Sequence, residues 1–391
     1  MTEQQIKKYS FPTEQTLLPD ELRAAFWKCN YTEGLKPLHY WVILPNNVKP
    51  LFVEPVEADE VKLTIIGQYA RTDDSPYYEV QVVYEHVSYE MNASDWLLKK
   101  ISLIGETILE SRIVQGESTG KYLDVLTWKQ TSGGEEMISR FTVLKDYDVD
   151  KSGANLFCIK ASCIVEAYEQ LSLSMLQTVA NFNLIHKSDW QMAESIFPFS
   201  YEFVEPLSFY VPDSWEIKYD EGNTTSYAQF VLLHNTIQDG QKGLISAWFF
   251  ERDTAIDLDI VLRRVAGIYS KHYHQLPTLA LEECLNPVIE QFWNTQGEIR
   301  YDDDNSSAFL TVCILRTAKG WYYFEMTGPN PNFENDYWEI NKRCIEMIIE
   351  SLNNPEFRKS KVNHGAQSNS VDVPEIDAPQ QNSWLPPDWK Y

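Results

Sequence analysis

The chain has 391 residues, 43% hydrophobic and 23% charged, which is an ordinary composition for a folded protein of two or three domains. Its 33 basic and 57 acidic residues give a formal net charge of −24. This charge repels nucleic-acid phosphates and anionic membrane surfaces, so we expect the protein to bind no nucleic acid and not to insert into membranes.

Export and redox signals are missing from the sequence. The first ten residues hold no apolar run of the secretory kind, and no later run approaches the roughly 18 apolar residues that span a bilayer. The six cysteines are scattered without a Cys-x-x-Cys pair, which predicts reduced thiols and no metal site. We therefore expect a cytoplasmic protein.

Residues 1–35 form an N-terminal arm in which Leu17–Cys29 is predicted to be helical, because Pro19 and Asp20 are typical of a helix start.

Residues 36–187 then show strand and helix patterns in turn. An aromatic strand ends at Pro45, and two β-branched strands and a helix follow. The helix is indicated by apolar residues spaced 4-3-4 along one face, which are Leu97, Ile101, Ile104 and Ile108. Three more strands and a helix from Leu171 to Phe182 complete this first part.

After a linker at residues 188–204, the same order of patterns returns over residues 205–354. Pro212 stands in this second part where Pro45 stands in the first. The helical stripe from Leu258 to Tyr269 follows the stripe of the first part by nearly the same number of residues as Pro212 follows Pro45. A near-constant offset over separate landmarks indicates a tandem repeat.

Residues 355–391 form a tail rich in Ser, Asn, Gln and Pro and poor in aliphatic residues, so we expect it to be disordered. Its end holds Trp384 and Trp389 on a proline-stiffened segment. Such a segment is suited to anchoring in a groove, either of a partner or of this chain itself.

Enzyme motifs lack the context that would support them. Gly116-Glu-Ser118-Thr-Gly120 matches the hydrolase nucleophile elbow, but here a helix is predicted before the turn and a strand after it, the reverse of the elbow. His272 and His274 are two residues apart and would point to different sides of a helix. We expect no enzymatic activity, no cofactor and no metal, while a diffuse site without a motif stays an alternative.

Three strands of the second repeat, at residues 244–250, 308–315 and 321–324, are apolar on both faces. If helices cover one face, the other face needs a cover too. The other repeat or the arm could supply it, or the face could form a groove for a partner protein. The predicted partner-binding residues lie on these strands and in the tail: Trp248, Phe250, Trp321, Tyr323, Trp384 and Trp389.

The second repeat opens with Leu207-Ser-Phe-Tyr-Val-Pro-Asp-Ser-Trp215, continues through Glu251-Arg-Asp253 into the helix at 258–269, and ends in a helix at 337–352. In these features it resembles the PsbP/Mog1/DcrB-like fold and, within it, the Eag-type effector chaperones of type VI secretion. The first repeat matches more loosely, because it lacks a tryptophan after its opening proline turn.

The resemblance implies antiparallel sheets packed with helices, no catalytic residues, and a surface that shields the hydrophobic transmembrane helices of an effector. Two repeats in one chain would form a monomer that acts as an internal pseudo-dimer. A tandem protein is also similar to the accessory (AsaA-like) proteins of type VI secretion, which would bind a subunit of the apparatus.

We therefore predict an α+β fold of two tandem repeats, each an antiparallel sheet packed with two main helices, followed by the disordered tail. The predicted function is that of a non-enzymatic chaperone, adaptor or accessory component of type VI secretion, which binds an effector or apparatus subunit through its sheet faces. One alternative is an immunity protein that binds a basic toxin through its acidic surface, with salt-sensitive affinity. The other is an enzyme with an unrecognised site.

Overall fold

The structure is a computed structural model in which the chain divides into two units. Within the described residues, unit 1 runs up to Ser88 and from Ala93 to Gln191. Unit 2 combines the short segment Tyr89–Asn92 with the chain from Met192 onwards. The residues whose structure is described are 9–56, 63–73, 76–116, 120–148, 150, 152–202, 206–219, 227–236, 240–251, 263, 279–300, 307–332, 335–355 and 357.

Unit 1 begins with a small sheet in the strand order β1-β2-β10. Its central strand β2 (Tyr40–Pro45) is buried along its whole length, because it pairs with β1 (Phe26–Tyr31) on one side and with β10 (Phe182–Leu184) on the other. The short helix α1 (Pro19–Ala25) leads into β1, and a 3-10 turn η1 (Lys36–Leu38) precedes β2. Strand β10, near the end of unit 1, therefore belongs to the same small sheet as β1 and β2 from its beginning.

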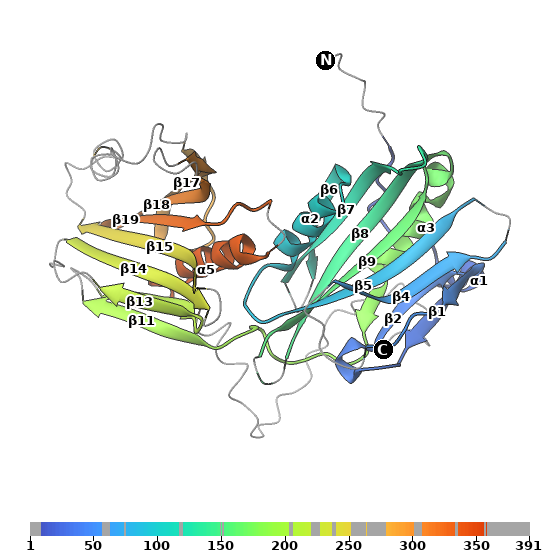
Figure 1. The fold of residues 1–391 in the computed structure, drawn as a ribbon, viewed down its shortest axis with the longest axis horizontal. Helices are drawn as coiled ribbons and strands as arrows, with labels where there is room; N and C mark the ends of the chain where they lie inside the picture. Colours follow the sequence, from blue (N-terminus) through green and yellow to red (C-terminus); the bar gives the residue numbers. More distant parts are fainter. Residues whose placement is uncertain are drawn as a thin grey trace, which may run out of the picture. The chain divides into compact units, whose positions relative to one another are not determined.

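A seven-stranded antiparallel sheet in the order β3-β4-β5-β9-β8-β7-β6 forms the body of unit 1 (Figure 1). Along β5, buried side chains alternate with half-buried ones from Tyr78 to Val83, as expected for a strand whose two faces differ. The strands are β3 (Val48–Leu51), β4 (Thr64–Arg71), β5 (Tyr78–Val87), β6 (Thr107–Gly116), β7 (Gly120–Gln130), β8 (Glu136–Tyr147) and β9 (Ala154–Ile164).

Two helices pack on opposite faces of this sheet. After a 3-10 turn η2 (Val165–Ala167), helix α3 (Tyr168–Ala180) packs its Met175 against the core formed by Val82 and Ile159. Helix α2 (Ala93–Leu103) lies on the other face, beside β7 and β8. The face under α2 is the one that carries the candidate site described below.

Unit 2 pairs β11 (Ile196–Glu202) with β12 (Pro206–Pro212) in a two-stranded sheet. Its main sheet has the order β13-β14-β15-β19-β18-β17-β16 (Figure 1). The strands of the main sheet are β13 (Trp215–Tyr219), β14 (Tyr227–Thr236), β15 (Gly240–Glu251), β16 (Ala280–Glu282), β17 (Ile289–Arg300), β18 (Ser307–Thr317) and β19 (Gly320–Gly328).

The main sheet of unit 2 is buried on both faces along β15, β18 and β19. One face joins Phe249 and Phe324 to helix α5 (Tyr337–Ser351) through Ile345 and Ile348 in a large core. The opposite face carries a second apolar cluster that contains Trp248 and Tyr323. This burial explains why the strand sequences show no polar alternation.

The two main sheets have the same strand order, and their central registers agree. In unit 1, Val83 of β5 pairs with Cys158 of β9. In unit 2, Trp248 of β15 pairs with Tyr323 of β19, and each of these two residues follows its counterpart in unit 1 by the same number of positions. Each position on the central strands of one sheet therefore has a defined counterpart on the other.

The predicted α+β class is wrong. Each repeat was expected to form one sheet with two main helices, but the described residues form four sheets with nineteen strands and only four α-helices, of 7 to 15 residues. Part of the predicted helical pattern belongs to strands, since Ile108 lies in β6 and Phe182 in β10. Edge strands such as β6 and β13 were not predicted at all.

Several predicted boundaries also differ from the observed elements. The arm helix stops at Ala25, and the residues after it, three of them aromatic, form β1, which includes Cys29. The predicted linker contains β11, and the predicted tail begins with Phe357 buried against Met192 and Met347. Apart from residue 263, the helix expected at 258–269 lies outside the described residues, as does the tail from 358 onwards.

Candidate binding site

Unit 1 contains an apolar cleft of about 400 Å³ between α2 and its main sheet. The helix contributes Trp96, Leu97 and Ile101, and the opposite wall is made by strand residues such as Val83 and Phe141. The remaining lining residues are Leu63, Ile65, Gln81, Lys100, Ile104, Glu106, Lys129, Cys158 and Lys160. The cleft opens at apolar residues that stay in contact with water: Leu63 is 44% exposed, Ile65 41% and Ile104 37%.

Ionic groups lie at the polar parts of this cleft. The Nζ atom of Lys160 is 2.6 Å from an oxygen of Glu106, whose carboxylate also accepts a hydrogen bond from the hydroxyl of Thr127. The Nζ atom of Lys100 is 2.7 Å from Glu85, which in turn accepts a hydrogen bond from the indole of Trp96. These pairs fix the polar side chains in a largely apolar space.

Lys129 differs from the other two lysines of the cleft. Its Nζ atom donates a hydrogen bond of 2.6 Å to the carbonyl oxygen of Ile104, just beyond the end of α2. Within the described parts of the chain, no carboxylate lies at ion-pair distance from it. A cation next to the apolar mouth of the cleft is therefore available to a negatively charged group.

The edge of the same sheet presents further apolar side chains. In the described residues β6 pairs only with β7, so its other edge has no neighbouring strand. Ile108 and Ile113 on β6 are 42% and 62% exposed. A ten-residue strand with an open edge and exposed isoleucines can accept an added strand from another chain.

Four of the predicted partner-binding residues are brought together, on the face of the unit 2 sheet opposite α5. They are Trp248, Phe250, Trp321 and Tyr323, and all four are buried. They form part of a core, with the Trp248 and Tyr323 ring centroids 5.2 Å apart. Their role in partner binding stays a prediction, and Trp384 and Trp389 lie outside the described residues.

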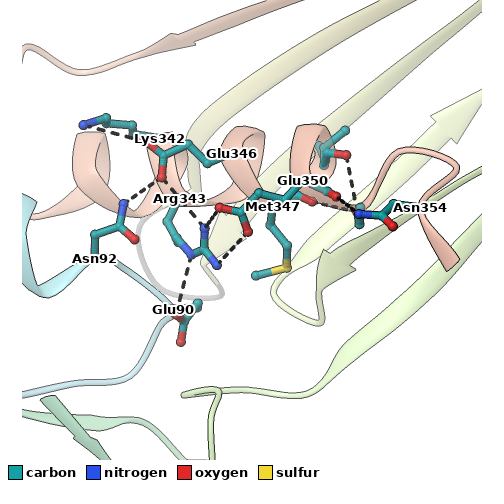
Figure 2. Close-up of polar contacts among 10 residues, drawn as sticks. Glu90, Asn92, Lys342, Arg343, Glu346, Met347, Glu350 and Asn354 are labelled. Carbon is teal, nitrogen blue, oxygen red and sulfur yellow. Dashed lines mark hydrogen bonds and ion pairs between the residues drawn. The ribbon is translucent and has the colours of Figure 1, made fainter. Parts of the chain in front are cut away.

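A second polar arrangement, in unit 2, surrounds Arg343 on α5 (Figure 2). Its guanidinium lies 3.1 Å from Glu350, 3.7 Å from Glu90 and 3.9 Å from Glu346. The amide of Asn92 donates a hydrogen bond to Glu346 as well. Arg343 is 6% exposed and its charge is matched by carboxylates, so the arrangement fixes the segment Tyr89–Asn92 to α5 instead of leaving a free functional group.

Catalytic and metal chemistry find little support in the described residues. Burial raises the pKa of the Cys158 thiol in the cleft to about 12, so it is protonated and a poor nucleophile at neutral pH. All six cysteines are free thiols. No group of three His, Cys, Asp or Glu side chains within the described ranges could hold a metal ion.

The structure bears on one of the two enzyme motifs considered in the sequence, and the other lies outside the described residues. Gly116 and Gly120 pair with each other as the ends of strands β6 and β7, whereas a hydrolase elbow joins a strand to a helix. Ser118 lies outside the described residues. His272 and His274 lie outside the described residues. None of the described helices has the length and apolar character needed to cross a bilayer.

Sequence reasoning did not find the cleft. The apolar stripe of Leu97, Ile101 and Ile104 indicated a helix face that packs against a core. The sequence did not show that Ile104, at the end of this stripe, is partly exposed at the mouth of a cleft. The lysines come from α2, β7 and β9, so their proximity is visible only in three dimensions.

Comparisons with known proteins assign no family. No protein-family model matches the chain, and no curated protein matches it. A crystal structure of LpqN, involved in cell envelope biogenesis of Mycobacterium tuberculosis, is 7% identical over 42% of this chain and 94% of that chain, with a TM-score of 0.30. The di-domain ARO/CYC StfQ of the steffimycin biosynthetic pathway is 7% identical over 73% of this chain and 95% of that chain, with a TM-score of 0.11. The type VI secretion assignment therefore stays a prediction.

Proposed function

We propose that the protein is a non-enzymatic binding protein that holds a protein partner at the open edge of unit 1. The observation that carries the proposal is the ten-residue edge strand β6 with its exposed Ile108 and Ile113. Backbone groups along such an edge supply affinity for an extended segment, and the isoleucines supply apolar contact. Soluble proteins usually protect an edge of this kind.

The partner is a different chain and not a second copy. Each copy carries a formal net charge of −24, and two such chains repel each other. A partner with an extended apolar segment matches the class of chaperone, adaptor or accessory component. The sequence resemblance supplies type VI secretion as the setting in which to search, with an effector or an apparatus subunit as the candidate.

The test compares a double variant of the edge with a single control variant, both in the tagged full-length chain. Ile108→Lys with Ile113→Lys places two charges on the edge, and Leu285→Lys is the matched control, because Leu285 is 86% exposed on unit 2. We expect a partner that is recovered from the host, and then reconstituted from purified components, to bind the control like the native chain and to lose at least tenfold in affinity for the edge variant.

Two results would contradict this function. Equal binding of the reconstituted partner to both variants would remove β6 from the interface. Binding that disappears in moderate salt but tolerates the edge variant would favour an immunity protein, which would use the acidic surface.

A further inference from the structure

We infer that the cleft of unit 1 is a binding site for an anionic single-chain amphiphile, whose alkyl chain lies between α2 and the sheet and whose charged end lies at Lys129. This ligand is separate from the protein partner proposed for the β6 edge. The inference rests on the size of the cleft, on its charge, and on the contrast with the other unit.

The size of the cleft suits a small ligand. The cleft has a volume of about 400 Å³. Pockets of about 300–1,000 Å³ with mainly apolar walls and a few placed polar groups are typical of small-molecule sites.

The charge of the cleft is opposite to that of the chain. Its lining holds three lysines and one glutamate, although the whole chain carries a net charge of −24. Lys160 is neutralised by Glu106 and Lys100 by Glu85, which leaves the charge of Lys129 to attract an anion. An apolar cavity with one uncompensated cation at its mouth matches a carboxylate or phosphate on an alkyl chain.

Unit 2 carries larger side chains at the corresponding positions of its described central strands. The counterparts of Val83 and Cys158 in the paired central strands are Trp248 and Tyr323, and these large rings fill the corresponding face. In unit 1 the smaller Val83 and Cys158 leave the space open. Among the described residues, the open space at these paired positions therefore goes with the small side chains of unit 1.

The experiment measures displacement of 1-anilinonaphthalene-8-sulfonate from the full-length chain and stoichiometry by native mass spectrometry. The probes share a twelve-carbon chain: dodecanoate, dodecyl phosphate, dodecanol and dodecyltrimethylammonium. We expect one dodecanoate per chain, with the cationic probe at least tenfold weaker. Comparing dodecanoate with dodecyl phosphate identifies which anionic head group is preferred, and either preference supports the inference.

Two variants locate the site. Lys129→Met should weaken dodecanoate about tenfold and leave dodecanol unchanged, since one charge-assisted contact is lost. Lys49→Met is the matched control, because Lys49 is an exposed lysine of unit 1 outside the cleft. Val83→Phe copies the filled face of unit 2 and should abolish binding of all four probes.

Equal binding of the anionic and cationic probes, or an unchanged dodecanoate affinity in Lys129→Met, would overturn the inference. So would native dodecanoate binding by Val83→Phe. None of these results depends on the protein partner, because the Ile108→Lys and Ile113→Lys variant should bind dodecanoate normally.

Discussion

At the residue scale, His234 of unit 2 is a fully buried base. Its ring stacks on Trp215 with centroids 5.2 Å apart and meets the edge of Tyr89 at 5.0 Å. Burial, with a smaller contribution from the nearby charge of Lys242, lowers the pKa of His234 from 6.5 to about 4, against the neighbouring side chain of Asn341, which raises it. Folded unit 2 therefore holds His234 neutral over a pH range in which the unfolded chain protonates it.

This arrangement predicts acid sensitivity. As the pH falls from 6.5 to 4, the unfolded chain takes up a proton that the folded state refuses, so the free energy of unfolding of unit 2 should fall by about 3 kcal/mol. His234→Phe removes the titrating group and should flatten that dependence. Urea unfolding at pH 7, 6 and 5 measures it, and equal slopes for both chains would refute the assignment.

Asp146 of unit 1 has the opposite dependence. It is 8% exposed and accepts a hydrogen bond of 3.0 Å from the backbone N–H of Ser188. Burial is the largest cause that raises its pKa from 3.8 to about 6. The folded state thus keeps a proton that the unfolded chain has lost, and the free energy of unfolding falls as the pH rises through this window.

Asp146→Asn should therefore stabilise unit 1 at pH 7 by about 3 kcal/mol and have little effect at pH 3.5. Asp150→Asn changes an exposed carboxylate just after the end of β8 and is the matched control, which should not stabilise unit 1 at either pH. Urea unfolding of the three chains decides between these outcomes, and an equal gain at both pH values would point to packing instead of charge.

At the scale of elements, Arg343 fixes helix α5 to the segment Tyr89–Asn92 (Figure 2). Arg343→Leu would remove one partner of the ion pair with Glu90, which is 4% exposed, and removing one partner of a buried pair costs about 3–5 kcal/mol. Lys342→Leu removes a cation of the same helix that is 37% exposed and 3.8 Å from Glu346, which should cost less than about 1 kcal/mol. Denaturant midpoints compare them, and similar losses would contradict the buried role.

The sequence predicts best the elements whose apolar residues repeat along one buried face. The final helix of unit 2 is one, because Ile340, Cys344 and Ile348 lie on one buried face of α5. Strand β6 escaped prediction because an edge strand in water has no apolar alternation to display. Strand β11 lies in the predicted linker although Phe197, Phe199 and Tyr201 alternate along it as in a strand, and its pairing with β12 is visible only in the structure.

At the scale of the whole molecule, each unit has its own core, so unfolding should occur in two transitions. Asp146→Asn should shift one transition, and His234→Phe and Arg343→Leu the other. Differential scanning calorimetry of the variants checks this assignment, and a single transition that moves with every variant would show one cooperative unit.

The repeated order of strands could be anticipated from the offset of sequence landmarks, but the difference between the units could not. Val83 and Trp248 are both apolar strand residues, and their patterns predict the same environment. Only the size of the side chain at equivalent positions separates an open cleft from a filled face.

Unit 2 is discontinuous in the chain, since Glu90 lies in it together with Arg343, and nearly all of unit 1 that follows Glu90 is synthesised between them. A ribosome adds about 5–20 residues per second, so the carboxylate is made roughly 10–50 seconds before its guanidinium partner exists. Unit 1 has time to fold in that interval, with Tyr89–Asn92 still in water. Completion of unit 2 therefore has to await the synthesis of α5, and the segment Tyr89–Asn92 is a nascent surface on which a chaperone or protease could act first.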